Sequence, residues 1–211
     1  MKKMIAMVIC LVLALSMAGC ATPEEEVRQK IQFPENDAGA DREIQPVGTP
    51  VEEAFDIAVS YANWTEESKI YSRALNTGKM AVSSVLHLPI YKFDTLEELE
   101  QFKLTFGEVL TMDSGYDEVP SFNDVTADYD EAFFDENALM LVYVSANSGS
   151  YRFGVNSVFC NGSSFCIHVE QLNDPEVGTA DMAGWFITVA VPNSMVANCS
   201  EFDADLNNIE N

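Results

Sequence analysis

In the first half of the chain, hydrophobic positions recur in short patterns that predict separate elements. Residues 54–62 place an apolar side chain at every second position, which predicts a strand, although the alanines within it also suit a helix. Residues 66–76 are expected to form a short helix. Residues 80–90 are apolar and β-branched, which predicts a strand that ends at Pro89.

The clearest helix is predicted over residues 95–106. Thr95 and Glu98 have the spacing of a capping box, and apolar residues follow at helical intervals. Residues 113–128 are acidic and hold glycine and proline, so we expect a loop there. A short helix is predicted over residues 129–134.

The second half of the chain changes to the pattern of a sheet. The run 139–146 is continuously apolar, Ser148-Gly149-Ser150 marks a turn, and Asn161-Gly162 marks a hairpin. Strands are predicted at 139–146, 151–155, 165–169 and 185–191. The expected fold is therefore α+β, a single domain over residues 51–211 with a small antiparallel sheet in the C-terminal half packed by N-terminal helices.

The first 20 residues have the pattern of an export signal. Lys2 and Lys3 precede an apolar stretch over residues 4–18, and Ala18-Gly19-Cys20 resembles the bacterial lipobox, whose cysteine is lipidated and whose preceding signal peptide is removed. The alternatives are an uncleaved membrane anchor and an ordinary secretory signal. We expect a signal peptide over residues 1–19 and a membrane anchor on the outer face through a two-chain lipid on Cys20.

Residues 20–50 are predicted to be a flexible tether, because they hold four prolines and many charges but little apolar periodicity. Removal of residues 1–19 takes away Lys2 and Lys3 and leaves 9 basic against 34 acidic residues, so the net charge falls from −23 to −25. A chain this acidic is not expected to bind nucleic acid, which requires neutralised phosphates. Its apolar content, 47%, is sufficient for a packed core.

Arg152 is the one candidate for recognition chemistry. It is the only Lys or Arg after Lys103, in a stretch with 18 Asp and Glu. Either it pairs within the domain, for example with Asp181 or Glu176, or it recognises a carboxylate or phosphate on a partner. With Tyr151 and Trp185 it forms the proposed binding set. Trp185 and its neighbour Phe186 are both expected to pack, and an exposed Trp185 would make an interface anchor.

The cysteines leave two interpretations open. Cys160 and Cys166 are bridged if a five-residue loop sets them opposite each other, and they are free thiols if the turn is tighter. Cys199 is expected to be unpaired. With Cys20 lipidated and Cys10 in the signal, an odd number of thiols remains in the domain.

No residue pattern predicts a catalytic centre, a metal site or a cofactor. The sequence lacks the nucleophile elbow, the zinc motifs and the nucleotide-binding glycine loops, and His87 and His168 are interpreted as structural. Asp203-Ala204-Asp205 has the spacing of a calcium loop but lacks the following glycine. An envelope hydrolase with paired carboxylates, similar to a glycosidase, is the alternative function.

Two resemblances extend this interpretation. The segments 129–134, 139–144, 148–152 and above all 175–185 resemble uncharacterised exported lipoproteins of gut anaerobic bacteria. The turn Ser148-Gly149-Ser150-Tyr151, between two strands, is similar to one in the C-terminal β domain of the PrcB proteins, which are components of a protease complex. The second resemblance implies a non-enzymatic binding or accessory module for another envelope protein.

Overall fold

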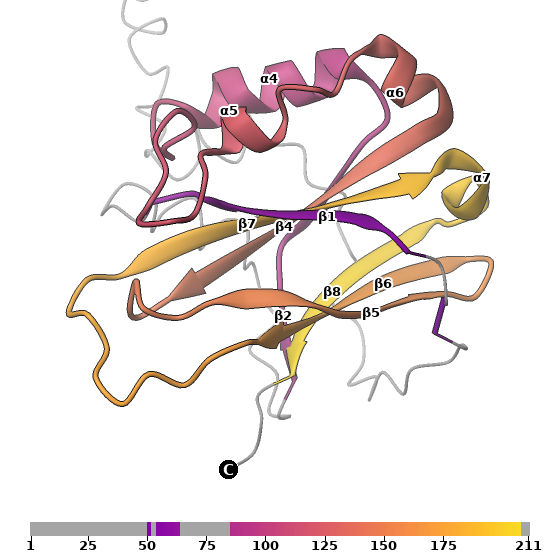
Figure 1. The fold of residues 1–211 in the computed structure, drawn as a ribbon. Coiled ribbons are helices and arrows are strands. Elements are labelled where there is room, and N and C mark those ends of the chain that lie inside the picture. Colours follow the sequence, from indigo (N-terminus) through magenta and orange to yellow (C-terminus); the bar gives the residue numbers. More distant parts are fainter. Residues whose placement is uncertain (1–49, 52–53, 64–84, 208–211) are drawn as a thin grey trace, which may run out of the picture. The chain divides into compact units, whose positions relative to one another are not determined.

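The computed structural model describes residues 50–51, 54–63 and 85–207, which form a mixed α+β domain rich in strands (Figure 1). The first sheet runs β1 (Asp56–Tyr61), β7 (Ala183–Pro192), β4 (Asn137–Ala146), β3 (Ile90–Phe93), and all its pairs are antiparallel. The second runs β2 (Val85–His87), β8 (Glu201–Asn207), β6 (Ser164–Gln171), β5 (Phe153–Cys160). Four short helices lie in this part of the chain: α4 (Leu96–Phe106), α5 (Phe122–Val125), α6 (Glu131–Glu136) and α7 (Asn193–Val196).

The prediction of an α+β chain is confirmed, but the single small antiparallel sheet is not: the described strands form two sheets, and the second contains one parallel pair, β6 with β8. Strands β1, β2 and β3 come from the first half of the chain and complete two sheets. The segment predicted as one strand divides at Leu88-Pro89: the Leu88 N–H donates to Ala204 O, and Pro89 O accepts from Tyr143 N. The chain thus passes from the second sheet to the first at a proline, which cannot donate in a ladder.

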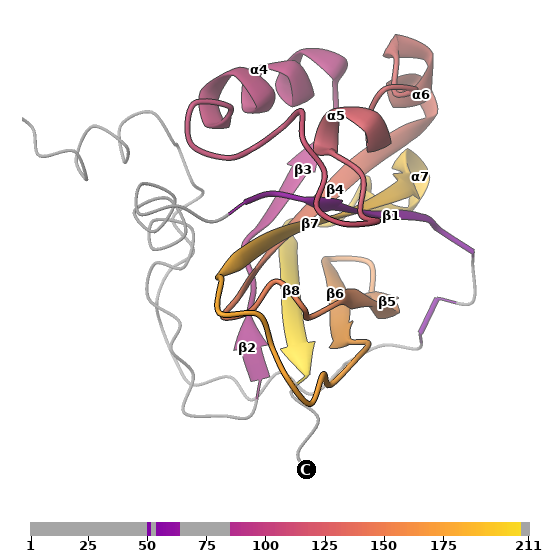
Figure 2. The same cartoon turned by 60° about the vertical axis from the view of Figure 1, so that its left-hand side comes forward.

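The centre of the domain is the antiparallel pair β4 and β7, which share ten register positions. Side chains alternate along a strand, so each strand has two faces. One face packs against the second sheet, with Met140, Val142, Trp185 and Ile187 among its buried members. The other face carries Phe186, whose ring lies 5.9 Å from Phe102 of α4 and 4.9 Å from Phe122 of α5. Figure 2 shows these helices on the side of the first sheet away from the second.

Helix starts follow the capping residues. Thr95 caps α4 as predicted, its Oγ1 accepting from Glu98 N at 3.2 Å. Asp130 caps α6 in the same way, accepting from Phe133 N. Inside the segment expected to be a loop, Ser121 and Asp124 form a capping box that starts the short helix α5. None of the helices in the described ranges is long and apolar enough to cross a membrane.

Several predictions concern residues outside the described ranges: the signal peptide, Cys20, the helix at 66–76 and nearly all of the tether. At the tether boundary, Pro50 already bridges to Phe159 and the Val51 N–H donates to Val158 O. Pro50 therefore already contacts the domain.

Of the two interpretations of Cys160 and Cys166, the structure excludes the bridge and agrees with free thiols. The hairpin register sets Cys160 opposite Phe165 and Phe159 opposite Cys166, so the two cysteines point to opposite faces of the sheet. Both are free, and Cys160 packs against the core. Its neighbour is Cys199, predicted to be unpaired, whose Sγ lies 3.7 Å from that of Cys160.

The spacing at residues 203–207 that partly matched a calcium loop has another origin. These residues form β8, which pairs in parallel with β6. The alternation that resembled ligand spacing is the two-residue period of a strand, with Ala204 and Leu206 in the core and the aspartates on the other face.

We predict that oxidation joins Cys160 to Cys199. Treating the full-length protein with a small organic disulfide should transfer the two thiol electrons to the reagent, releasing two reagent thiols and forming the bridge. Closing a loop between positions 39 apart should stabilise the domain by about 4 kcal/mol in the chain-entropy model. Peptide mapping should find this bridge with Cys166 still free; a bridge containing Cys166 would contradict the register.

Candidate functional site

Two loops meet at one end of the first sheet, where β4 ends beside the start of β7. The turn 147–152 connects β4 to β5, and the loop 172–182 connects β6 to β7. Ala146 pairs with Ala183 in the sheet, so the central strand pair brings the two loops together (Figure 1). We call the surface formed by residues 147–152 and 172–182 the loop-end surface.

Serine and threonine hydroxyls join these two loops. Ser148 is buried, and its Oγ lies 3.1 Å from Thr179 Oγ1. The Thr179 N–H donates to Ser150 Oγ at 3.0 Å, and Gly149 N donates to Asp181 O at 3.0 Å. A side chain at Gly149 would meet the Tyr116 hydroxyl at 2.6 Å, so the close approach requires glycine. The predicted turn is therefore joined to the loop 172–182 by several hydrogen bonds.

Tyr116 attaches a third segment to the loop-end surface. Its hydroxyl donates to Asp181 Oδ2 at 3.0 Å, and its ring stacks on Tyr61 at 5.0 Å. Hydrogen bonds from Thr179 and Tyr116 lower the pKa of the Asp181 carboxyl. Asp181 is thus engaged by Tyr116 and does not pair with Arg152, contrary to one prediction.

Arg152 is used within the domain. Its Nη1 donates to Gly149 O at 2.7 Å and to Tyr151 O at 3.0 Å, and its Nη2 donates to Asp117 Oδ2 at 3.3 Å. The guanidinium also lies over the Trp185 ring, 5.1 Å from its centroid. The prediction of an internal ion pair is confirmed, with Asp117 in place of Asp181 or Glu176. Arg152 thus holds the turn, and recognition of a partner through it is not supported by these contacts.

Trp185 is 1% exposed, so the condition under which it would anchor an interface is not met. The expectation that Trp185 and Phe186 both pack is confirmed, since each is 1% exposed. Tyr151, the third member of the proposed set, is half-buried and lines a pocket of about 350 Å³ together with Phe153 and Met182. Of the three residues in the proposed binding set, Tyr151 is therefore the one that lines this pocket.

Exposed apolar side chains gather on the same surface. Among the described residues, five large apolar side chains are exposed, and three of them lie in the loop 172–182: Leu172, Val177 and Met182. Val177 is the most exposed of all, at 85%. Isolated exposed apolar residues are ordinary, but three in one loop, of which Met182 also lines the pocket, make this loop a candidate interaction site.

A second pocket, of about 560 Å³, bears on the hydrolase alternative. It lies along α4 and the following turn, and its lining includes Glu100, Glu108 and Asp113. Glu100 is paired with Lys103 at 2.8 Å, which leaves Glu108 and Asp113 as the carboxylates of this pocket. The pocket of about 350 Å³ that Tyr151 lines has no carboxylate in its lining. The carboxylates that could act as a pair therefore line a different pocket from the one that Tyr151 reaches.

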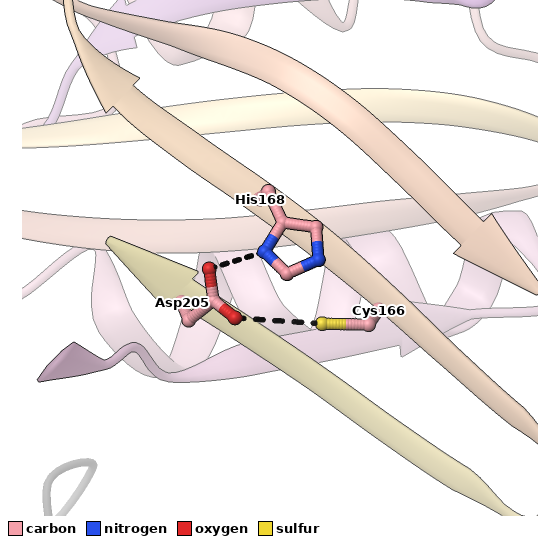
Figure 3. A group of neighbouring side chains, drawn as sticks. All are labelled: Cys166, His168 and Asp205. Atoms are coloured by element: carbon pink, nitrogen blue, oxygen red, sulfur yellow. Dashed lines mark hydrogen bonds and ion pairs between the residues drawn. The ribbon is translucent and has the colours of Figure 1, made fainter. Parts of the chain in front are cut away.

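A cluster on the second sheet was not predicted from the sequence. Strands β6 and β8 bring together Cys166, His168 and Asp205 (Figure 3). The sequence signal was the alternation of polar side chains in the segments that form β6 and β8. His168 and Asp205 are 37 positions apart, so local spacing could not predict that they meet. Burial and the nearby carboxylates of Asp205 and Asp203 raise the pKa of the Cys166 thiol to about 12, which opposes a role as a thiolate nucleophile.

A scan of protein-family models and searches of curated proteins and solved structures find no match to this chain. The resemblances to exported lipoproteins and to the PrcB domain therefore stay predictions.

We predict that Arg152 stabilises the domain. Replacing it with alanine removes the contact with Trp185 and leaves two turn carbonyls without their donor, which should lower the free energy of unfolding by about 2 kcal/mol. Asp117→Asn is the matched control, because Asp117 is mostly exposed and its pair should contribute less than about 1 kcal/mol. Urea unfolding measures both, and an unchanged midpoint in Arg152→Ala would contradict the structural role.

Proposed function

We propose that this protein is a lipid-anchored lipoprotein on the outer face of a bacterial cell membrane, and that its domain is a non-enzymatic binding module for another envelope protein. The observation that carries the proposal is the loop-end surface. It combines a hydrogen-bonded turn, a pocket lined by apolar and polar side chains, and exposed apolar side chains. Surfaces that are fixed before binding lose less conformational entropy when they bind.

The charges and apolar side chains of the loop-end surface indicate what kind of partner segment it would bind. Asp174 and Glu176 are in the loop 172–182, and the largely exposed Asp117 lies beside the turn. Arg152, the cation at this surface, is already engaged with Asp117 and two carbonyls. The surface is therefore acidic around an apolar centre, and it suits a segment that presents an apolar side chain flanked by lysine or arginine. Nucleic acid is unsuitable, because its phosphates would be repelled.

The anchor is the second component. A lipid with two chains on Cys20 would hold the protein stably at the membrane. The tether would then let the domain reach a partner near the surface. The resemblance to the PrcB C-terminal domain supports the same class of function, since it also implies a module that acts on another protein.

The anchor can be tested with Cys20→Ser. We expect the wild type to incorporate a clickable fatty acid and to sediment with membranes, and the variant to incorporate none, because serine offers no thiol. Cys199→Ser is the control for a cysteine change elsewhere in the chain. Labelling that persists in Cys20→Ser would contradict the lipidation site.

The binding surface can be tested with a photoreactive amino acid placed at Val177 in living cells. We expect a crosslink to one envelope protein, since Val177 is 85% exposed at the centre of the proposed contact. Leu104 is the matched control: it is 73% exposed but lies on α4, away from the loops. Added salt should weaken the crosslink by screening the charge contacts.

Two outcomes would overturn this function. The first is that Val177 gives no protein crosslink. The second is that Leu104 crosslinks the same protein equally well, which would mean that proximity and not the loop-end surface determines the contact. A partner crosslinked at Val177 and lost in Met182→Glu would support it, because Met182 lines the pocket and is exposed.

A further inference from the structure

Both histidines of the chain lie on the outward face of the second sheet. His87 is on β2 and His168 is on β6, and β8 runs between them with Asp203 and Asp205 on the same face. Alternation fixes this placement, because the neighbouring residues of β6 and β8 point into the core. Cys166, two residues before His168, shares that face.

Three of these side chains converge (Figure 3). His168 Nδ1 lies 2.5 Å from Asp205 Oδ1, and Cys166 Sγ lies 3.9 Å from Asp205 Oδ2. One ligand atom from each of the three residues falls within 4.8 Å of the other two. The carboxylate is thus shared between an imidazole and a thiol, all on two adjacent strands.

The cluster is largely shielded from water. The Asp205 side chain is 6% exposed and that of His168 is 11% exposed. A buried carboxylate is costly unless a positive charge or hydrogen-bond donors compensate it. Among the described residues, Lys92, Lys103 and Arg152 pair with Asp94, Glu100 and Asp117, so the groups in contact with Asp205 are the His168 imidazole and the Cys166 thiol. A divalent cation would supply positive charge for the carboxylate and for a thiolate together.

We propose that Cys166, His168 and Asp205 bind a divalent transition-metal ion of the zinc class. Zinc takes sulfur, imidazole nitrogen and carboxylate oxygen at about 2.0–2.3 Å in tetrahedral sites, which sets ligand atoms roughly 3.3–3.7 Å apart. The present separations lie on both sides of that range, so the ion fits after shifts of about 1 Å. Three protein ligands leave the fourth position to water.

The ligand set distinguishes this ion from others. Calcium and magnesium prefer oxygen ligands, and the cluster supplies oxygen from one carboxylate only. A thiolate with an imidazole selects zinc or a similar ion. On binding, the thiol proton leaves to solvent. The proton between His168 Nδ1 and Asp205 moves to Nε2, or to solvent where Nε2 already carries one, and the ion takes the place of the contact between His168 and Asp205. The two strands supply all three ligands, so the ion would crosslink β6 and β8 through their side chains.

The test uses the purified full-length protein in detergent, with Co²⁺ as a spectroscopic substitute for Zn²⁺. We expect a sulfur-to-cobalt charge-transfer band at one equivalent, which Zn²⁺ abolishes by displacement and Ca²⁺ does not. Cys166→Ser should abolish the band and weaken Zn²⁺ binding by at least about 100-fold, since changing a residue that only supports a ligand already costs up to about that much. Cys199→Ser, which changes another half-buried thiol of the domain, should retain both.

Absence of the band in the wild type, or its persistence in Cys166→Ser, would overturn the proposal. Circular dichroism checks that Cys166→Ser is folded. X-ray absorption at the zinc edge of the wild type requires no variant. One sulfur among the zinc neighbours supports the site, and a shell of nitrogen and oxygen alone contradicts it.

Discussion

The fold depends on the burial of β4 and β7 on both faces. Ten residues of each strand pair in register, one face against the second sheet and the other against the aromatic side chains of α4 and α5. Each fully buried aliphatic or aromatic side chain contributes about 1.5–3 kcal/mol, so this strand pair supplies the largest shared part of the core. Both outer layers need it, because the helices and the second sheet each have only one apolar face to bury.

The two functional proposals follow from this arrangement. Where β4 ends and β7 begins, the loops leave the sheet together, and hydroxyl contacts, Tyr116 and Arg152 hold them in one conformation. The second sheet packs its apolar face on β4 and β7, so its polar residues are directed to the opposite face, where Cys166, His168 and Asp205 meet. The pocket beside the loops takes Gln171 from β6 and Leu206 from β8, the strands that carry Cys166, His168 and Asp205, so the two sites share elements but no residue.

Features that depend on nearby residues could be predicted from the sequence. The run 139–146 indicated a buried strand, and Thr95 with Glu98 marked the start of α4. Prediction failed where pairing between distant segments decides the outcome. The hairpin register separated Cys160 from Cys166, β8 was hidden because its acidic alternation resembled ligand spacing, and Arg152 found Asp117, 35 positions away. The cluster of Cys166, His168 and Asp205 required the parallel pairing of β6 with β8, which no local pattern specifies.

The central claim is that the partner binds at the loop-end surface. Its most direct test compares amide hydrogen exchange of the full-length protein alone with exchange in the presence of the partner captured at Val177. We expect amides of β4 and β7 to exchange most slowly in the free protein, because they open only on global unfolding. We also expect the partner to slow exchange in residues 147–152 and 172–182 and to leave α4 unchanged. Protection that falls on α4, with none in the two loops, would contradict the assignment of the loop-end surface as the binding site.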